Sequence, residues 1–299
     1  MSARWIDLVD PSPAELESLP FRLDPESIEI LCAPAGDGRD ARPTLESHGA
    51  HVVGVFLVPR HVDDHDRFDY LEIDAIATGG VLVTIRKTGR NREVVEAGPL
   101  ASAVEGGHEV GFLLHRVVDL VADAYLDAVD GLYLEIDELE DTVDTLPSDD
   151  VRRRLALLRH EIHHARRNAS ATRAAARRVL DGRLDVGRDE LFPEPVERAF
   201  ADTYDALVRV TEELDIARDL LAGVRDYVQS RVFESQNEVV KKLTVIASLV
   251  LVPTLITGFY GQNFAGAFDD WWWSVATSAA LIVGSTVAQV IFFRWRRWI

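Results

Sequence analysis

Hydrophobic and polar residues alternate differently in three parts of the chain. In the first hundred residues, three runs rich in β-branched residues are bounded by proline, glycine and charged clusters, at 51–59, 68–78 and 81–87. Such runs are typical of strands. Asp10-Pro11-Ser12 and Asp24-Pro25 each combine a capping residue with a proline and predict helix starts. Residues 1–107 are therefore predicted to form a small α/β domain.

Helical periodicity dominates from residue 109 onward. Two helical segments, 109 to about 146 and 151 to about 180, are separated by the turn LPSDD. The first contains the acidic stretch LEIDELEDTVD and the second the basic stretch VRRRLALLRHEIHHARR. Since opposite charges attract, we expect the two helices to pack as antiparallel neighbours.

A longer helix follows these two. Its apolar and small side chains recur alternately three and four residues apart, at Phe200, Thr203, Leu207, Val210, Leu214, Ala217, Leu221, Val224 and Val228. No proline interrupts the sequence between Pro195 and Pro253. We therefore predict one continuous helix whose stripe packs against other helices, within the same chain, in other copies, or both. Residues 108–242 form this helical region.

The C-terminal part, 243–299, contains two uncharged apolar runs. Residues 243–260 read LTVIASLVLVPTLITGFY and residues 271–293 read WWWSVATSAALIVGSTVAQVIFF. At ~1.5 Å per residue, the first run spans roughly 27 Å as a helix, close to the thickness of a bilayer's hydrocarbon core. The pattern predicts a hairpin of two membrane helices. A buried core hairpin is the alternative, but the flanking residues argue against it.

Charged and aromatic residues flank this hairpin asymmetrically. Basic residues lie before the first run and after the second: Lys241, Lys242, Arg294, Arg296 and Arg297. The connection between the runs carries only Asp269 and Asp270. Because basic residues favour the cytoplasmic side, both termini are expected in the cytoplasm and the protein in the cell membrane. Tryptophans at both ends of the hairpin suit the two interfacial belts.

The overall composition limits the classes of partner. The chain has 32 Lys+Arg against 50 Asp+Glu, a formal charge of −18, which argues against nucleic acid and favours cations or basic surfaces. Ordinary solubility or a salty cytoplasm explains the charge equally well. The single cysteine, Cys32, gives neither an intrachain disulfide nor a multi-cysteine metal site, so a reducing compartment is expected. The N-terminus lacks the pattern of a secretion signal, so we expect it to remain in the cytoplasm.

One motif is typical of an enzyme. His160-Glu161-Ile162-His163-His164 matches H-E-x-x-H, in which two histidines one helical turn apart bind zinc and the glutamate acts as base. The surrounding arginines disfavour a dication, and the sequence places no third ligand. We therefore expect a solvated helix rather than a metallopeptidase. The first hundred residues contain no Gly-rich phosphate loop and no nucleophile elbow, so no catalytic residue is assigned.

One face of the long helix is suited to lining an ion path. The stripe comprises Asn237, Val240, Leu243, Ala247, Leu251, Thr254, Gly258 and Gly261, with Asn263 just beyond it and Asp226 and Gln229 continuing it toward the cytoplasm. Along the stripe a carboxylate and amides are followed by apolar side chains, a hydroxyl, glycines and an amide. Magnesium sheds water reluctantly, so such a path suits a hydrated cation. One chain cannot enclose a pore, and several copies must assemble. Alternatively, Thr254 and Asn263 only cap and pack the hairpin.

These residues carry a family resemblance. The segment NEVVKKLTVIASLVLVPTLITGFYGQNF resembles the first membrane helix and signature loop of the CorA family of divalent-cation transporters, whose motif is Tyr-Gly-Met-Asn-Phe. The resemblance extends to WIDLVDPSPAEL, LDPESIEIL, the paired helices, the long helix and the C-terminal RWRRWI. It implies an α+β membrane protein. The expected assembly is a homopentameric funnel with a cytoplasmic α/β domain, a helical stalk and two rings of membrane helices.

The resemblance also implies a function and residue roles. It implies passive passage of Mg²⁺, or of Co²⁺ or Ni²⁺, driven by the membrane potential, without a prosthetic group. The family's functional positions fall on residues of this chain as follows: selectivity asparagine Asn263, motif glycine Gly261, pore threonine Thr254, inner asparagine Asn237, pore aspartate Asp226, constriction Val240, Leu243 and Leu251, and regulatory metal site Asp202 with Asp205 nearby.

The sequence departs from the family pattern in three places. Gln262 replaces the motif methionine, as occurs in relatives such as the zinc-transporting ZntB group, so a proton-coupled Zn²⁺ transporter stays an alternative. The outer loop AGAFDD lacks the usual Met-Pro-Glu, although Asp269 and Asp270 still attract cations. Gln229 stands where the family usually has a leucine in the inner constriction. A purely structural membrane anchor is the remaining alternative.

Overall fold

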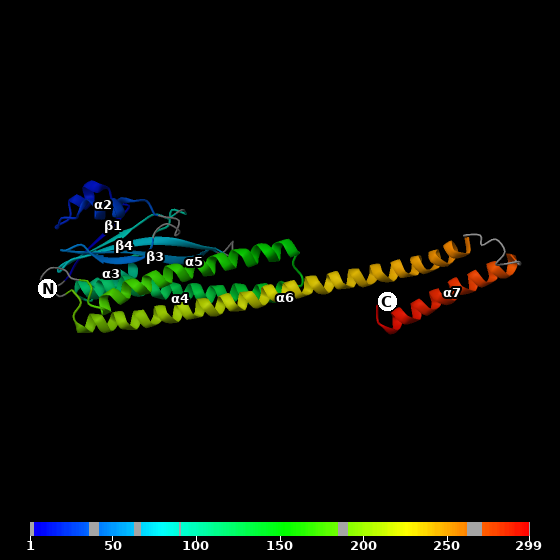
Figure 1. Cartoon of the computed structure of the whole chain (residues 1–299). Helices are drawn as coiled ribbons and strands as arrows, with labels where there is room; N and C mark the ends of the chain where they lie inside the picture. Colours follow the sequence, from blue (N-terminus) through cyan, green and yellow to red (C-terminus); the bar gives the residue numbers. More distant parts are fainter. Residues whose placement is uncertain are drawn as a thin grey trace. The chain divides into compact units, whose positions relative to one another are not determined.

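The computed structural model describes residues 3–35, 42–62, 67–89, 91–184, 191–261 and 271–298 (Figure 1). In chain order the elements are β1 (Arg4–Val9), α1 (Pro13–Glu17), α2 (Pro25–Cys32), β2 (Thr44–Ser47), β3 (Val52–Val62), β4 (Arg67–Ala77), β5 (Val81–Arg86), α3 (Gly98–Glu105), α4 (Val110–Thr142), α5 (Ser148–Leu180), α6 (Glu194–Gly261) and α7 (Trp271–Trp295). The chain divides into two compact units, Met1–Arg225 and Asp226–Ile299.

The first unit contains a five-stranded mixed sheet in the order β1-β5-β4-β3-β2. β1 pairs with β5 in parallel, and the other neighbours are antiparallel. The three strands predicted from the sequence are β3, β4 and β5. Every residue of β4 from Tyr70 to Ala77 is buried, which requires cover on both faces of the sheet.

Helices provide this cover (Figure 1). α1 and α2 lie on one face, where Leu16 and Leu31 pack against Val53, Ile76 and Val83 of the sheet. α4 and α5 lie on the other face. Both predicted helix starts are confirmed, since Ser12 forms a capping box with Glu15 and the Asp24 carboxylate accepts the Ser27 N–H at 2.8 Å.

Three short elements were not predicted: β1, β2 and α3. β1 is only partly buried and carries Asp7 in its centre, which interrupts an apolar pattern. The Asp7 carboxylate is held by the Arg86 guanidinium at 2.6 Å on the neighbouring strand. β2 is four residues long. Strands this short depend on pairing with neighbours distant in sequence, which a local pattern does not contain.

The antiparallel helix pair differs from the prediction only at its turn. α5 begins at Ser148 rather than at residue 151, with Asp149 and Asp150 in its first turn. Acidic side chains are favoured there by the positive end of the helix dipole. The predicted attraction between the two helices is confirmed, because the Arg154 guanidinium lies 2.7 Å from the Glu135 carboxylate of α4.

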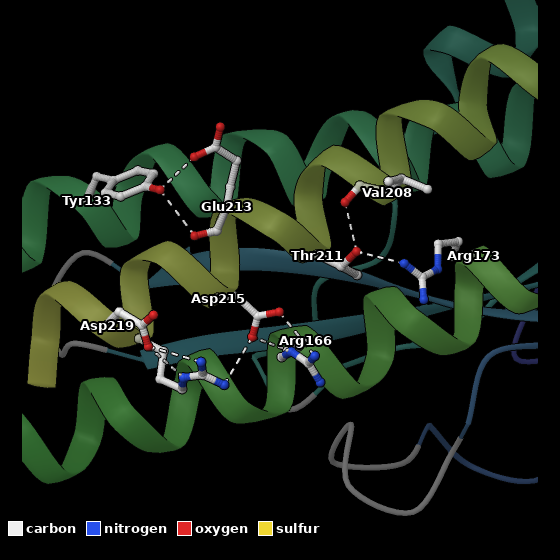
Figure 2. Close-up of polar contacts among 9 residues, drawn as sticks. Tyr133, Arg166, Arg173, Val208, Thr211, Glu213, Asp215 and Asp219 are labelled. Carbon is white, nitrogen blue, oxygen red and sulfur yellow. Dashed lines mark hydrogen bonds and ion pairs between the residues drawn. The ribbon is translucent and has the colours of Figure 1, made fainter.

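The long helix α6 is continuous over 68 residues, as predicted. Its near-heptad stripe is buried from Phe200 to Val224, and only Val228 of the predicted stripe is partly exposed. The stripe packs within the chain, where polar contacts join α6 to α4 and α5 (Figure 2). The helix passes through Pro253, whose missing N–H leaves the Leu249 carbonyl without its usual intrahelical donor.

In the second unit, α6 and α7 both contain segments long and apolar enough to cross a membrane. Their apolar side chains are largely exposed, including Leu243, Leu255 and Val283. The core helix of a soluble protein would bury such residues. Length, composition and exposure therefore agree with the predicted membrane hairpin.

Candidate ion path and metal sites

The described part of the predicted ion path lies on the second half of α6. Asn237, Val240, Leu243, Leu251, Thr254 and Gly261 are all exposed on this helix, as is Asp226. Leu243 and Leu251 are each 65% exposed. Helical spacing places these residues on one face, with Asp226 and Asn237 at its N-terminal end and apolar groups further along. Within the described part of one chain, the α6 face predicted to line a path is thus exposed.

Thr254 is the hydroxyl on this face. Its Oγ1 donates to the Val250 carbonyl at 2.6 Å, the i−4 bond common for threonine in apolar helices. The hydroxyl hydrogen is thereby used, and the oxygen lone pairs can accept a hydrogen bond from a cation's hydration water. This geometry suits a role as acceptor along a hydrated path.

The outer-mouth residues lie outside the described part of the chain. These are Gln262, Asn263, Asp269 and Asp270, which follow the last residue of α6, Gly261, and precede α7. Their assignment rests on the sequence, and they stay predictions.

Asp202 and Asp205 are both exposed, one turn apart near the start of α6. They border an open hollow of about 480 Å³ together with Glu212, Arg209, Ala206 and Val208. Across the described ranges, no group of three or more His, Cys, Asp or Glu side chains is arranged so that it could hold a metal ion. A metal held by Asp202 would accordingly need water or a second copy of the chain to complete its ligands.

Behind Asp202 lies a polar contact that sequence reasoning missed. The Thr203 hydroxyl lies 2.9 Å from His115 Nε2 and donates to the Asp119 carboxylate at 3.2 Å. Burial lowers the pKa of His115, and the Asp119 charge only partly offsets this effect. These α4 residues fix the rotation of α6, so Asp202 on the adjacent position points outward. Only one sign of this contact is present in the sequence: His115 and Asp119 lie four residues apart and therefore on the same side of α4.

Further along, three polar contacts clamp α6 between α4 and α5 (Figure 2). The Tyr133 hydroxyl donates to Glu213 Oε2 at 2.6 Å, the Arg166 Nε donates to Asp215 Oδ1 at 2.8 Å, and Arg173 donates to Thr211 Oγ1 at 3.0 Å. The hydrogen bond from Arg166 lowers the pKa of Asp215. All three lie before Val224, so the clamp ends where the exposed part of α6 begins.

The H-E-x-x-H motif does not have the geometry of a hydrolytic zinc site. The rings of His160 and His164 lie 4.2 Å apart, as expected for positions one turn apart. Glu161, which would act as base, is buried and accepts the Phe68 backbone N–H at 3.2 Å. Its carboxylate is directed at the sheet instead of a solvent-exposed metal. The expected solvated helix holds for the exposed His160 and His163 and is wrong for Glu161, which faces the sheet.

A family model described as "CorA-like Mg2+ transporter protein" matches residues 2–297. The chain belongs to the CorA-like Mg²⁺ transporter family. The protein is therefore a divalent-cation transporter and not an enzyme, as the sequence predicted.

Relatives and solved structures agree with this membership. The cobalt/magnesium transport protein CorA of Thermotoga maritima is 28% identical over 193 residues, covering 63% of this chain and 52% of that relative. The zinc transport protein ZntB of Photorhabdus laumondii is 22% identical, covering 92% and 81%. The complete CorA structure from Methanocaldococcus jannaschii matches with a TM-score of 0.75 at 22% identity, covering 99% of this chain and 91% of that one. The fold of this CorA-family chain is thus the fold of a full-length transporter, with α/β domain, long helix and two apolar helices.

Proposed function

We propose that this chain moves Mg²⁺ passively into the cell through a pore lined by α6. The observation that carries the proposal is the exposed face from Asp226 to Gly261, on which polar and apolar positions follow one another in the order a hydrated cation requires. Membership in a Mg²⁺ transporter family supports the choice of ion. Co²⁺ and Ni²⁺, similar in charge, are expected as further substrates.

A pore requires several copies of the chain. A single α6 presents one convex face and cannot enclose a path, and many apolar residues of its second half are exposed, among them Ile246, Val250 and Leu255. We propose a homopentamer with α6 facing the axis and α7 outside it, as the family resemblance implies. Apolar side chains such as Ile246 and Leu255 then face neighbouring helices or lipid.

Selection takes place at the outer mouth in this proposal. Five copies of Asn263, with backbone carbonyls near Gly261 and Gln262, accept hydrogen bonds from the hydration shell of the ion. Asp269 and Asp270 raise the local concentration of cations. An inside-negative potential then draws the ion inward, and two charges crossing the full field gain roughly 4.6 kcal/mol per 100 mV.

Further along the path, three apolar rings form the gate. Val240, Leu243 and Leu251 are exposed on the path-lining face, and rings of such side chains exclude water when they approach one another. Asn237 and Asp226 receive the ion on the cytoplasmic side. Both chain termini lie in the cytoplasm, because Lys241, Lys242 and the C-terminal arginines flank the hairpin on the same side.

Cytosolic metal regulates the gate through Asp202 and Asp205. Both side chains are exposed on the stalk beside an open hollow, and a neighbouring copy can supply the ligands that one chain lacks. Metal bound between copies holds the stalks together and keeps the pore closed. Falling cytosolic metal releases them, which makes entry self-limiting.

The second candidate is a proton-coupled Zn²⁺ transporter of the ZntB type. It is favoured by Gln262 in place of the motif methionine and by the similarity to ZntB proteins. Dication uptake into liposomes containing the purified protein separates the two. Mg²⁺ entry that follows an inside-negative potential supports the channel. Zn²⁺ entry that requires a proton gradient supports the alternative, and no flux of any dication contradicts both.

A further inference from the structure

The turn that follows α7 is a folded cap. Beyond Trp295, the last residue of the helix, the Trp298 N–H donates to the Phe293 carbonyl at 2.9 Å and the Arg297 N–H donates to the Arg294 carbonyl at 3.1 Å. These two bonds define a Schellman motif. The hydrophobic contact that accompanies the motif is also present, since the Trp298 and Phe293 rings stack with centroids 5.8 Å apart. The cap therefore fixes the backbone of this turn.

Arg297 occupies the position of the motif where glycine is usual. Its φ is +56°, in the left-handed region that an arginine adopts only at a conformational cost. A glycine would close the same turn without that cost. A residue held in a strained conformation is a reason to look for a role of its side chain. Arg297 is exposed, so this role concerns the surface.

Three arginines form a cluster at this end of α7: Arg294, Arg296 and Arg297. All three are exposed. Other arginines of the chain are paired with carboxylates, as Arg166 is with Asp215 at 2.8 Å. Among the residues that the structure describes, no carboxylate pairs with any member of the cluster. In a chain with a formal charge of −18, the cluster is a concentrated positive surface that an anion can approach.

Aromatic rings surround the cluster. The Arg296 guanidinium carbon lies 5.8 Å from the centroid of the Trp295 ring and 5.9 Å from that of the Phe292 ring. Such cation–π contacts restrict the guanidinium, while its N–H groups stay able to donate. Trp295 is 78% exposed. An exposed tryptophan at the end of an apolar helix is typical of the headgroup level of a bilayer.

The position of the cluster along α7 indicates which anion it meets. Arg294 directly follows the uncharged run of a helix that is long and apolar enough to cross a membrane. At that level a bilayer changes from hydrocarbon to headgroups, whose anions are phosphodiesters. Guanidinium groups bind phosphate oxygens through paired N–H···O bonds. The exposed Trp295 ring favours a lipid over a soluble anion, because only a lipid brings hydrocarbon that covers the ring.

We propose that the C-terminal turn of α7 binds the headgroup of an anionic phospholipid. Arg296 and Arg297 hold the phosphate, and Trp295 lies at the boundary between the headgroup and the acyl chains. An anionic lipid is preferred to a zwitterionic one, because a zwitterionic headgroup brings its own cation to the cluster. The bound lipid anchors the end of α7 at one depth of the bilayer. The proposal rests on the membrane hairpin and not on the ion that passes the pore.

Lipid binding by the full-length protein in detergent tests this site. Native mass spectrometry counts the lipids bound per chain during titration with phosphatidylglycerol, which is anionic, or phosphatidylcholine, which is zwitterionic. The wild type is expected to bind phosphatidylglycerol at least about fivefold more tightly. Inorganic phosphate should not displace it. Equal affinity for the two lipids overturns the proposal, and displacement by inorganic phosphate overturns the choice of a lipid as the ligand.

The variants are chosen to keep the turn folded. Arg297→Gly removes a cation and places the preferred residue at the left-handed position, and Arg296→Gln removes the second cation. Each should weaken phosphatidylglycerol binding about fivefold, since a basic residue near an anionic membrane surface contributes affinity of that order. Arg159→Gln, at an exposed position of α5, removes the same charge and should leave binding unchanged. Phosphatidylglycerol binding that is unchanged in both Arg297→Gly and Arg296→Gln overturns the site.

Discussion

The Glu161 carboxylate on α5 accepts the backbone N–H of Phe68 on β4, with an N···O distance of 3.2 Å. The bond joins a helix to the sheet at a position where the sequence alone permits a catalytic base. This bond explains why an H-E-x-x-H motif occurs in a transporter. The glutamate stabilises the beginning of β4, and the flanking histidines lie on the outer side of the same helix.

We expect Glu161→Gln to leave transport and stability nearly unchanged, because the glutamine carbonyl can still accept the Phe68 N–H. Glu161→Ala should lower the free energy of unfolding by about 1–3 kcal/mol, since a buried donor then lacks its partner. Thermal unfolding of the detergent-solubilised protein checks both. Equal stability of the alanine variant and the wild type would contradict this structural role.

Two glycines of α4 offer a matched pair for packing. A Cβ on Gly111 would lie 2.0 Å from the Leu191 carbonyl oxygen, whereas a Cβ on Gly131 would meet nothing within 4 Å. Gly111→Ala should therefore lower the free energy of unfolding by about 1–3 kcal/mol, because the added methyl group overpacks this contact. Gly131→Ala should stabilise slightly, by up to about 1 kcal/mol, because alanine favours the helix. The same thermal assay measures both, and a tolerated Gly111→Ala would show that α4 and the segment before α6 are not in close contact.

A buried charge cluster predicts a pH effect on the α/β domain. The Lys87 ammonium lies 2.6 Å from Glu72 Oε1 and 3.0 Å from Asp74 Oδ2, and all three side chains are buried. Burial raises the pKa of Asp74 from 3.8 to about 7, although Lys87 opposes the shift. The folded state therefore binds a proton between about pH 4 and about pH 7 that the unfolded state releases, and this stabilisation is lost as the pH rises through that window.

Hydrogen exchange of the full-length protein measures this effect locally. We expect Asp74→Asn, which mimics the protonated carboxyl, to gain protection in β4 and β5 relative to the wild type as the pH rises from about 5 to about 8. Asp69→Asn on the same strand, where the side chain is not fully buried, is the control. A wild-type-to-Asn difference that stays constant with pH would mean that Asp74 does not titrate in this range.

Regulation by cytosolic metal predicts a specific loss of inhibition. With Asp202→Asn, Mg²⁺ uptake should continue when the compartment bathing the cytoplasmic domain contains high Mg²⁺, conditions that close the wild type. Asp219→Asn removes an exposed aspartate further along α6, away from the hollow, and should close normally. Uptake into liposomes preloaded with graded Mg²⁺ gives the comparison. If high Mg²⁺ inhibits uptake by Asp202→Asn as strongly as uptake by the wild type, Asp202 is not part of the regulatory site.

Long periodic segments were predictable because the pattern itself determines what packs. The α6 stripe from Phe200 to Val224 is buried where its 3–4 spacing placed it. The apolar hairpin was likewise recognisable by length and by its flanking charges. Short elements such as β1 and β2 were missed, since their stability comes from pairing with residues far away in the chain.

Local sequence patterns also could not predict contacts between residues that are far apart in the chain. Nothing in the sequence joins Asp24 to His51, or His115 to Thr203, because the fold alone brings them together. Conversely, the sequence names Asn263 and Gln262 as outer-mouth residues, and their assignment rests on the family motif. The stripe on α6 combines both kinds of information: its residues come from the sequence and its exposure from the structure.

The most direct test of the account asks which face of α6 lines the path. Leu251 and Ile246 are 65% and 61% exposed, and they lie about 140° apart around the helix. With Cys32→Ser as background, each is changed to cysteine and Mg²⁺ uptake into liposomes is recorded before and after a charged thiol reagent. We predict that the reagent blocks uptake through Leu251→Cys and spares Ile246→Cys. Block at Ile246→Cys alone, or uptake through Leu251→Cys that survives full modification, would contradict the proposed path.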